Sequence, residues 1–323
     1  MNYKNEHKDI PGNPSAVKTS SYKLNDRTNN SKLNVLSEND WSFWLTNGYV
    51  VIQNSISNSQ ADETARFLWE FENKNPDDPL TWNSKPRAEM QMKELIGTGM
   101  VEAYNHQALW SNRQSKKIYD AFVDIWGTHK LWVSIDRANL NFPISEYNEN
   151  LGFIHWDYDP DTKPVNVQGV LALSDQIDEN MGGFQCVPRL FREYDSWKLS
   201  QPNNRDKFKP DVSDFKNEII KVPLKKGDLL IFNSLLPHGI RPNLSKNKIR
   251  IAQYVSMFPS EENNEALKEW RIKSWSKRIA PEGYAFPGDP RNWEQKKHKK
   301  APPGPPQGRQ NGGQNRSGEA SRR

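Results

Sequence analysis

A His-x-Asp triplet and a second histidine far along the chain restrict the folds that this sequence can adopt. His155 and Asp157 stand two residues apart, and His238 follows in a distant, mostly apolar segment. Side chains at positions i and i+2 of a strand project from the same face, roughly 7 Å apart at Cα. Two histidines and one carboxylate form a facial triad that leaves positions on iron(II) open, which suits non-haem oxygenase chemistry. The pattern therefore favours a β fold that brings distant strands to one interior metal site.

Chance remains an alternative interpretation of this pattern. The chain contains six histidines, and a His-x-Asp triplet also arises by accident. A histidine in an apolar stretch is often a core residue whose hydrogen bonds are satisfied. The sequence around the triad decides in favour of the metal site.

Short runs rich in β-branched and aromatic residues surround the three residues, and Gly, Pro and Asp turns separate these runs. Strands are predicted at 131–142, 165–173, 225–233 and 249–258, with a turn at 181–188 leading into another. Short strands joined in this way favour a double-sheet barrel or jelly roll. Apolar stripes and capping residues predict flanking helices that begin at Ser37, span Ser57 to Glu72, and lie near Ser115 to Trp126. The expected fold is mainly β with flanking helices, a double-stranded β-helix (jelly-roll, cupin-like) barrel.

One face of the predicted strand 131–142 changes character along its length. It carries Leu131, Val133 and Ile135 and then the polar residues Arg137, Asn139 and Asn141. An apolar face that becomes polar suggests a strand that leaves the core and enters a wet pocket. The three polar side chains are then candidates to bind the substrate or a carboxylate. The alternative is that Arg137 pairs with a surface acid and the asparagines serve a turn before Pro143.

The order of these elements resembles the phytanoyl-CoA dioxygenase-like family of iron(II)- and 2-oxoglutarate-dependent oxygenases. The resemblance covers roughly residues 37 to 260, and no single piece of it is specific. The stretch after Pro188 departs from the family pattern, because Arg189 to Arg192 stand where a Gly-Ser-His run is usual. The matching pieces are the entry segment Trp41–Ile52, His155-Trp156-Asp157, Ala172–Asp175, Glu179–Gly183 with Pro188, His238-Gly239 with Asn243, and Arg250.

The resemblance implies that His155, Asp157 and His238 bind Fe(II) and that 2-oxoglutarate and O2 are cosubstrates. It also implies that Arg250 binds the far carboxylate of 2-oxoglutarate, since a guanidinium offers two parallel hydrogen bonds and stays charged. Arg241 and Lys248 are competitors for that role, and Gln168 is a further candidate to bond the cosubstrate. The carboxylate of Asp157 argues against halogenation, because related halogenases have a small residue there.

Composition predicts one soluble domain, at residues 37–294, between two disordered segments. Residues 1–36 are poor in apolar side chains, and 295–323 carry eight Lys or Arg against one Glu, so the remainder is close to neutral. The basic tail suggests contact with nucleic acid, but the absence of interleaved aromatics favours a solvated tail without such a partner. No apolar run approaches the ~18 residues of a membrane span. The single cysteine and the polar N-terminus predict a cytoplasmic protein.

The predicted function is a dioxygenase that hydroxylates a small organic molecule and releases succinate and CO2. Two alternatives stay open. The same iron centre can support desaturation, ring formation or demethylation, and a barrel of this kind can also be a binding protein without catalysis. The sequence identifies neither the substrate nor the oligomeric state.

Overall fold

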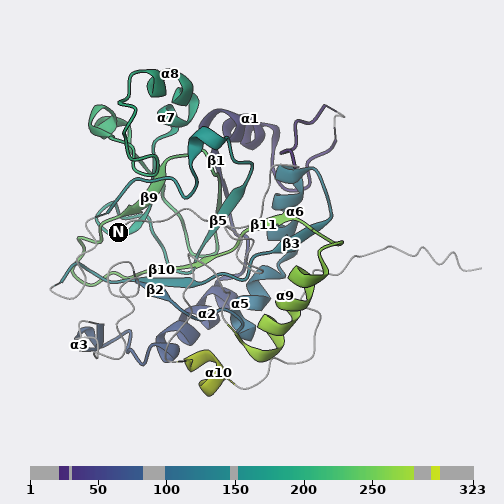
Figure 1. The fold of residues 1–323 in the computed structure, drawn as a ribbon. Helices are drawn as coiled ribbons and strands as arrows, with labels where there is room; N and C mark the ends of the chain where they lie inside the picture. The colour runs from purple at the N-terminus through teal and green to yellow at the C-terminus, as the bar shows by residue number, and fades with distance from the viewer. Residues whose placement is uncertain (1–21, 29–30, 83–98, 146–151, 280–291, 299–323) are drawn as a thin grey trace, which may run out of the picture.

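Two antiparallel sheets face each other and enclose an apolar interior (Figure 1). The computed structural model describes residues 22–28, 31–82, 99–145, 152–279 and 292–298. The larger sheet has the strand order β1-β8-β5-β10-β4-β2 and the smaller one the order β7-β6-β9. The larger sheet comprises β1 (Tyr49–Ile52), β2 (Met100–Val101), β4 (Ala138–Asn141), β5 (Val167–Ala172), β8 (Leu229–Asn233) and β10 (Arg250–Tyr254). The smaller one comprises β6 (Gly183–Cys186), β7 (Ile220–Lys221) and β9 (His238–Arg241).

Alternation along the strands separates two apolar layers. Val170, Leu230 and Ala252 of the larger sheet pack against Phe184 and Cys186 of the smaller one, and these side chains fill the space between the sheets. Residues of the opposite parity on the same strands, such as Leu171 and Ile231, join the core under the helices. The larger sheet is therefore buried on both faces.

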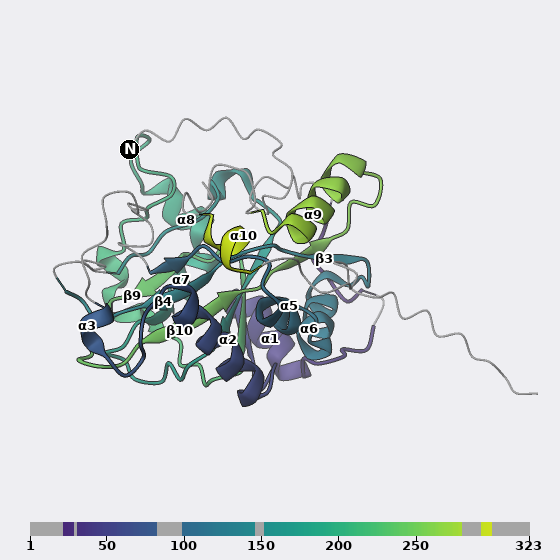
Figure 2. The same cartoon turned by 90° about the horizontal axis from the view of Figure 1, so that it is seen from below.

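Helices cover the outer face of the larger sheet, as Figure 2 shows from below. They include α1 (Glu38–Asn47), α2 (Asn58–Phe71), α5 (Gln107–Arg113), α6 (Lys116–Trp126) and α9 (Glu265–Lys277). Short helices α3 (Pro79–Trp82), α7 (Pro188–Arg192), α8 (Tyr194–Leu199) and α10 (Trp293–Lys297) lie at the periphery, with 3-10 turns at Pro160–Thr162 and Ser213–Glu218. Serine caps define three starts, because the side chains of Ser37, Ser57 and Ser115 accept backbone N–H groups of the first turn.

The three predicted helices and the strands predicted at 165–173, 225–233 and 249–258 are confirmed, the last as β10 and β11 (Met257–Pro259). The description of the fold as mainly β is wrong, because the described helices contain more residues than the strands and the fold is mixed α/β. A closed barrel is also not formed by the described strands, which divide among separate sheets. Among the described residues, no helix is long and apolar enough to cross a membrane.

The strand predicted at 131–142 is interrupted by a β-bulge. Its first part, β3 (Leu131–Val133), pairs with β11, and its second part, β4, pairs with β10. Ser134 N–H donates to Ser256 O (2.8 Å) and Tyr254 N–H donates to Arg137 O (3.0 Å). The segment from Ser134 to Arg137 thus has one residue more than the segment from Tyr254 to Ser256 that it faces.

The bulge corrects the prediction of one continuous face. An extra residue exchanges the two faces of the strand beyond it, because side chains alternate with a period of two. Ile135 belongs with β3 to the core under the helices, whereas Arg137 lies on a cavity between the sheets. The change from apolar to polar therefore marks two different faces, not one face that leaves the core.

Described residues outside the predicted domain 37–294 contact it on both sides. At the N-terminal side, residues 22–28 and 31–36 are described, Leu36 is buried, and Val35 packs against the core. At the C-terminal side, Lys297 of α10 donates to Phe71 O (3.0 Å). Residues on both sides of 37–294 thus contact this part of the chain, the division at 37 and 294 stays a prediction, and residues 299–323 of the predicted tail lie outside the described residues.

Asp124 of α6 holds the segment before α1. Its buried carboxylate accepts backbone N–H groups of Asn34 (2.8 Å), Val35 (2.8 Å) and Leu36 (3.0 Å). Asp124→Ala leaves these donors without their partner, so the free energy of unfolding should fall by about 2–4 kcal/mol. Asp120→Ala, on the same helix, removes only a surface pair with Lys116 and should change it by less than about 0.5 kcal/mol. Urea unfolding of both variants measures the difference, and equal effects would contradict this role.

Candidate metal centre

The strand segment before β5 and the strand β9 bring His155, Asp157 and His238 together. His155 and His238 form an antiparallel bridge, in which His155 N–H donates to His238 O (2.7 Å) and His238 N–H to His155 O (3.0 Å). Gly239 permits this close approach, because a Cβ there would lie 1.8 Å from Phe153 O. The backbone pairing thus fixes both histidines before any ligand binds.

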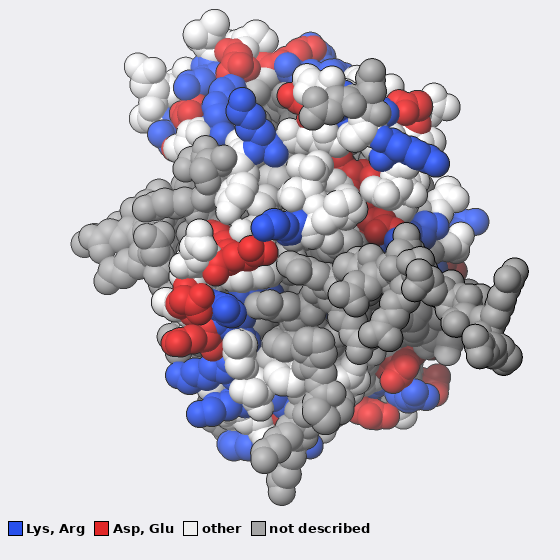
Figure 3. All heavy atoms as spheres, turned by 90° about the vertical axis from the view of Figure 1, so that its right-hand side faces the viewer, with Lys and Arg blue, Asp and Glu red and all other residues white. Residues whose placement is uncertain are grey.

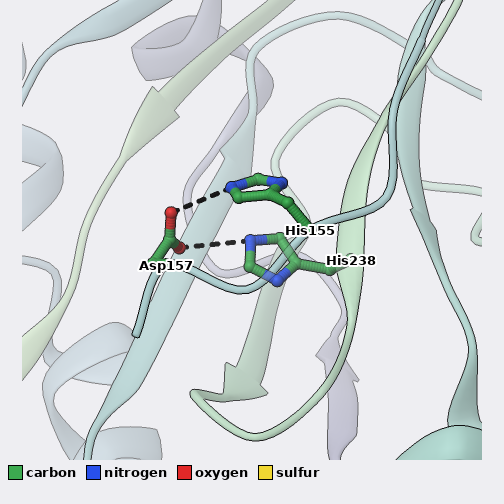
Figure 4. Close-up of side chains that lie close together, drawn as sticks. All are labelled: His155, Asp157 and His238. Carbon is green, nitrogen blue, oxygen red and sulfur yellow. Dashed lines mark hydrogen bonds and ion pairs between the residues drawn. The ribbon is translucent and has the colours of Figure 1, made fainter. Parts of the chain in front are cut away.

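The three side chains converge on one point (Figure 4). Their candidate ligand atoms all lie within 4.8 Å of one another. His155 Nε2 is 2.9 Å from one carboxylate oxygen of Asp157, and His238 Nε2 is 3.3 Å from the other. These distances place two nitrogen donors and one oxygen donor around a common centre.

The donor set fits a divalent transition metal. His238 Nδ1 lies 3.0 Å from Leu236 O, and if Nδ1 carries the proton, Nε2 presents its lone pair to the centre. His238 is buried, whereas the side chain of Asp157 is 34% exposed, so the open side of the triad faces the cavity. Burial raises the pKa of Asp157, but the charge and hydrogen bond of His155 and the hydrogen bond of His238 hold it well below its usual range. Burial lowers the pKa of His155, but Asp157 and a hydrogen bond with the backbone of His238 together raise it above its usual value. The carboxylate is thus kept in the form that binds metal.

A cavity of about 220 Å³ opens beside the triad, between the two sheets. Of the predicted site residues, Arg250, Gln168 and Arg137 line it together with the triad. Asn139 and Asn141 do not line it, although both are buried. Asn139 instead accepts a hydrogen bond from Arg250 Nη1 (2.7 Å) and so supports that side chain. Apolar lining comes from Met100, Phe153, Val167, Val170, Phe184, Phe232, Ile240 and Phe258.

Arg250 differs from the other cations near the cavity in its partners. It is 1% exposed, and within the described part of the chain its bonds are to neutral oxygens, those of Asn139, Gln176 (3.3 Å) and Tyr254 (3.5 Å). A buried guanidinium without a carboxylate is costly unless a ligand anion completes the site. The interior of the cavity is therefore suited to an anionic ligand at Arg250.

The competing cations are engaged elsewhere. Arg241 donates to the carbonyl oxygens of Met181 (2.9 Å), Phe184 (3.3 Å), Gln176 (3.0 Å) and Asp178 (3.2 Å). Lys248 is half exposed and forms an ion pair with Asp178 at 2.6 Å. Neither lines the cavity among the residues described.

Arg137 has a buried partner rather than a surface one. Its Nη1 lies 2.7 Å from Glu102, which is fully buried and also accepts the hydroxyl of Tyr104. The predicted alternative, in which Arg137 pairs with a surface acid, is therefore wrong, because its partner Glu102 is buried. The β-bulge before β4 turns Arg137 inward. Glu102 thus offsets part of the positive charge of Arg137.

Gln168 contacts the triad itself. Its Nε2 donates to Asp157 Oδ2 (2.6 Å), and its side chain projects from β5 on the cavity face. A hydrogen bond of this kind orients a metal-binding carboxylate.

Asp136 and Tyr158 are among the polar cavity residues that the sequence analysis did not identify. In a regular strand Asp136 would lie on the face opposite to Arg137, and nothing in the alternation marks the bulge that turns it toward the cavity. Burial raises the pKa of Asp136 to about 6, against the lowering effect of Arg137 and Arg113. Burial, with the charges of Asp157 and Asp136, raises the pKa of Tyr158, although a hydrogen bond from Asn166 lowers it. In the sequence, the position of Tyr158 directly after Asp157 is the signal that could have identified Tyr158 as a cavity residue.

These features define a candidate non-haem metal site with two histidines and one carboxylate between the sheets of a mixed α/β domain. The family model for phytanoyl-CoA dioxygenase matches residues 44–252. The chain belongs to the phytanoyl-CoA dioxygenase family and is thus an enzyme of the iron- and 2-oxoglutarate-dependent oxygenase type. A Dictyostelium discoideum protein whose name places it among phytanoyl-CoA dioxygenases is 24% identical over 277 residues, which are 72% of this chain and 78% of that protein.

The fold is similar to that of a solved structure with a TM-score above 0.5. The GlcNAc-inducible gene 2 protein of Candida albicans matches with a TM-score of 0.56 and 16% identity, over 77% of this chain and 69% of that chain. HygX from Streptomyces hygroscopicus, solved with nickel and 2-oxoglutarate bound, matches with a TM-score of 0.49 and 13% identity, over 71% of this chain and 89% of that chain.

Replacement of any triad residue by Ala should weaken iron(II) binding at least about 100-fold, because loss of a direct ligand exceeds the 10- to 100-fold effect of outer partners. Anaerobic calorimetric titration of His155→Ala, Asp157→Ala and His238→Ala measures this. The control is His129→Ala, an exposed position outside the cavity, which should bind iron as the parent does. Stoichiometric binding with unchanged affinity in all three triad variants would refute the site.

Gln168→Leu should retain all three ligands but release Asp157 Oδ2, and we expect iron(II) affinity to fall about 10- to 100-fold. Gln107→Leu on α5 removes a comparable amide from the surface, where it bonds only Ser111 among the described contacts. The same titration compares the two variants. An affinity within about twofold of the parent in Gln168→Leu would show that the hydrogen bond does not orient the ligand.

Proposed function

We propose that this protein is an iron(II)/2-oxoglutarate-dependent dioxygenase that hydroxylates a small organic molecule and releases succinate and CO2. His155, Asp157 and His238 hold the iron, and Arg250 binds the far carboxylate of 2-oxoglutarate. We interpret the two facing sheets as the jelly-roll scaffold of this enzyme class, with the cavity lying between them. The observation that carries the proposal is that one cavity contains both the triad and a buried arginine that has no carboxylate partner among the described residues.

The chain supplies binding, orientation and exclusion of water. Arg250 is the first residue of β10, and its side chain lies on the same face as those of Ala252 and Tyr254. Hydrogen bonds to Asn139 and Gln176 orient its guanidinium group. When bound, the iron supplies the oxidative chemistry that couples decarboxylation of 2-oxoglutarate to oxidation of the substrate. Phe184 and Phe232 form apolar walls beside His238 and limit the access of water to the centre.

Formation of succinate from 2-oxoglutarate under O2, with iron(II) present and with candidate small molecules added, tests the activity. Stimulation of this turnover by a small molecule that gains one oxygen atom supports hydroxylation. A product that lacks two hydrogens, gains a ring or loses a methyl group would replace hydroxylation by another outcome at the same centre. If no succinate formed with any of the added molecules, the alternative of a binding protein without catalysis would be supported.

Arg250→Ala should reduce the affinity for 2-oxoglutarate roughly 30- to 1000-fold, which corresponds to a buried, charge-assisted pair of about 2–4 kcal/mol. Arg250→Lys should restore only part of the affinity, because an ammonium group lacks the planar fork. Iron(II) affinity without 2-oxoglutarate should hardly change. Titration of 2-oxoglutarate into the anaerobic iron(II) form of each variant measures the effect.

Lys248→Ala is the matched control, since it removes a nearby cation that is already paired with Asp178. It should change the affinity for 2-oxoglutarate by less than about twofold. If Lys248→Ala lowered the affinity for 2-oxoglutarate and Arg250→Ala did not, Lys248 would be the residue that binds the far carboxylate. That result would contradict the proposed orientation of the cosubstrate.

A further inference from the structure

The β-bulge between β3 and β4 changes which side chains line the cavity. It inserts one residue between Ser134 and Arg137, so that the consecutive residues Asp136 and Arg137 both line the cavity. In a regular strand, consecutive side chains point to opposite faces. Bulges are enriched beside active sites, where they redirect a side chain. Here the redirected group is a carboxylate.

Asp136 forms no ion pair with a described residue, although the charges of Arg137 and Arg113 lie close enough to lower its pKa. Its Oδ1 accepts the backbone N–H of Arg137 (2.6 Å), and in the described part of the chain Oδ2 has no hydrogen-bond partner. The guanidinium of Arg137 pairs with Glu102, and that of Arg113 donates to the backbone oxygens of Tyr104 (2.6 Å) and Asp136 (2.7 Å). Both neighbouring guanidinium groups are therefore engaged with other atoms.

The other carboxylate among the described lining residues is Asp157, which belongs to the triad. Of the two arginines that line the cavity, Arg137 is paired and Arg250 is assigned to 2-oxoglutarate. Once iron and cosubstrate are bound, Asp136 is the carboxylate of the described lining that forms no ion pair with a described residue. A partly buried carboxylate of this kind is stabilised by a ligand of opposite sign with N–H donors.

The surroundings of Asp136 add two features. Tyr158 accepts a hydrogen bond from Asn166 Nδ2 (2.5 Å), so its own hydroxyl proton can be donated to a ligand. Apolar and aromatic side chains, among them Met100, Phe153 and Phe258, form the remaining wall. Aromatic faces also attract cations that approach them.

We infer that the substrate of this enzyme is a small, largely apolar or aromatic amine whose ammonium group binds to Asp136. The inference rests on the proposed function, because it assigns the part of the cavity that iron and 2-oxoglutarate do not use. The ammonium donates to Asp136 Oδ2 and the apolar body packs on Phe153 and Phe258. Asp136 is therefore a residue that determines specificity and holds the substrate, without a part in the oxidation.

Three probes of similar size and different charge test this inference: phenethylamine, phenethyl alcohol and hydrocinnamate. Each is titrated by calorimetry into the anaerobic complex of the full chain with iron(II) and 2-oxoglutarate. The amine should bind at least about 10-fold more tightly than the alcohol, and the carboxylate least. Equal affinities, or a preference for the alcohol or the carboxylate, would overturn the inference.

Asp136→Asn and Asp136→Ser provide the second measurement. Asn retains an oxygen for the N–H of Arg137 but removes the charge, so the amine should lose about 10- to 100-fold in affinity while the alcohol changes by less than about threefold. Asp62→Asn, which removes an exposed carboxylate paired with Lys226, is the control and should leave all three affinities unchanged. Retained preference for the amine in both Asp136 variants would overturn the role of Asp136.

The same experiment separates this inference from the proposed function. Titration of 2-oxoglutarate into the iron(II) form precedes the probes. Failure of 2-oxoglutarate to bind would overturn the proposed function and, with it, the inference. Binding of 2-oxoglutarate without a preference for the amine would overturn the inference alone.

Discussion

Strand β10 pairs with β4 on one side and with β5 on the other, and these two pairings set the geometry of the cavity. They place Arg250 opposite Asn141 and Ala252 opposite both Asn139 and Ala172. Because a one-residue slip would turn every side chain of β10 to the other face, this register fixes Arg250 on the inner side. The helices on the outer face bury that side of the sheet, so a slipped register, which would place Arg250 beneath them, is excluded.

The charges of the interior are distributed so that each arginine has a different kind of partner. Arg241 binds backbone oxygens, Arg137 binds Glu102, and Arg250 binds neutral side chains. Buried charges without compensation are strongly destabilising, so the first two serve the fold. Arg250 bonds only neutral oxygens among the described residues, and under the proposed function 2-oxoglutarate supplies its anionic partner.

The face on the right of Figure 1, drawn in Figure 3, carries Lys and Arg together with Asp and Glu rather than one sign alone. This agrees with the nearly neutral composition of the chain outside 295–323. The electrostatic features that matter for function lie inside the cavity, where charges of both signs are only partly exposed to water and interact more strongly than at the surface.

The sequence by itself determined the helices that serine caps begin, the strands around the triad and the residue types of the centre. Capping, alternation and metal-ligand chemistry are local properties, so they can be read from neighbouring residues. Only the tertiary structure decided the pairing of Arg137 with Glu102, the support of Arg250 by Asn139, and the exchange of faces at the bulge. The inward position of Asp136 depends on the register between two strands more than a hundred residues apart, and no local pattern specifies that register.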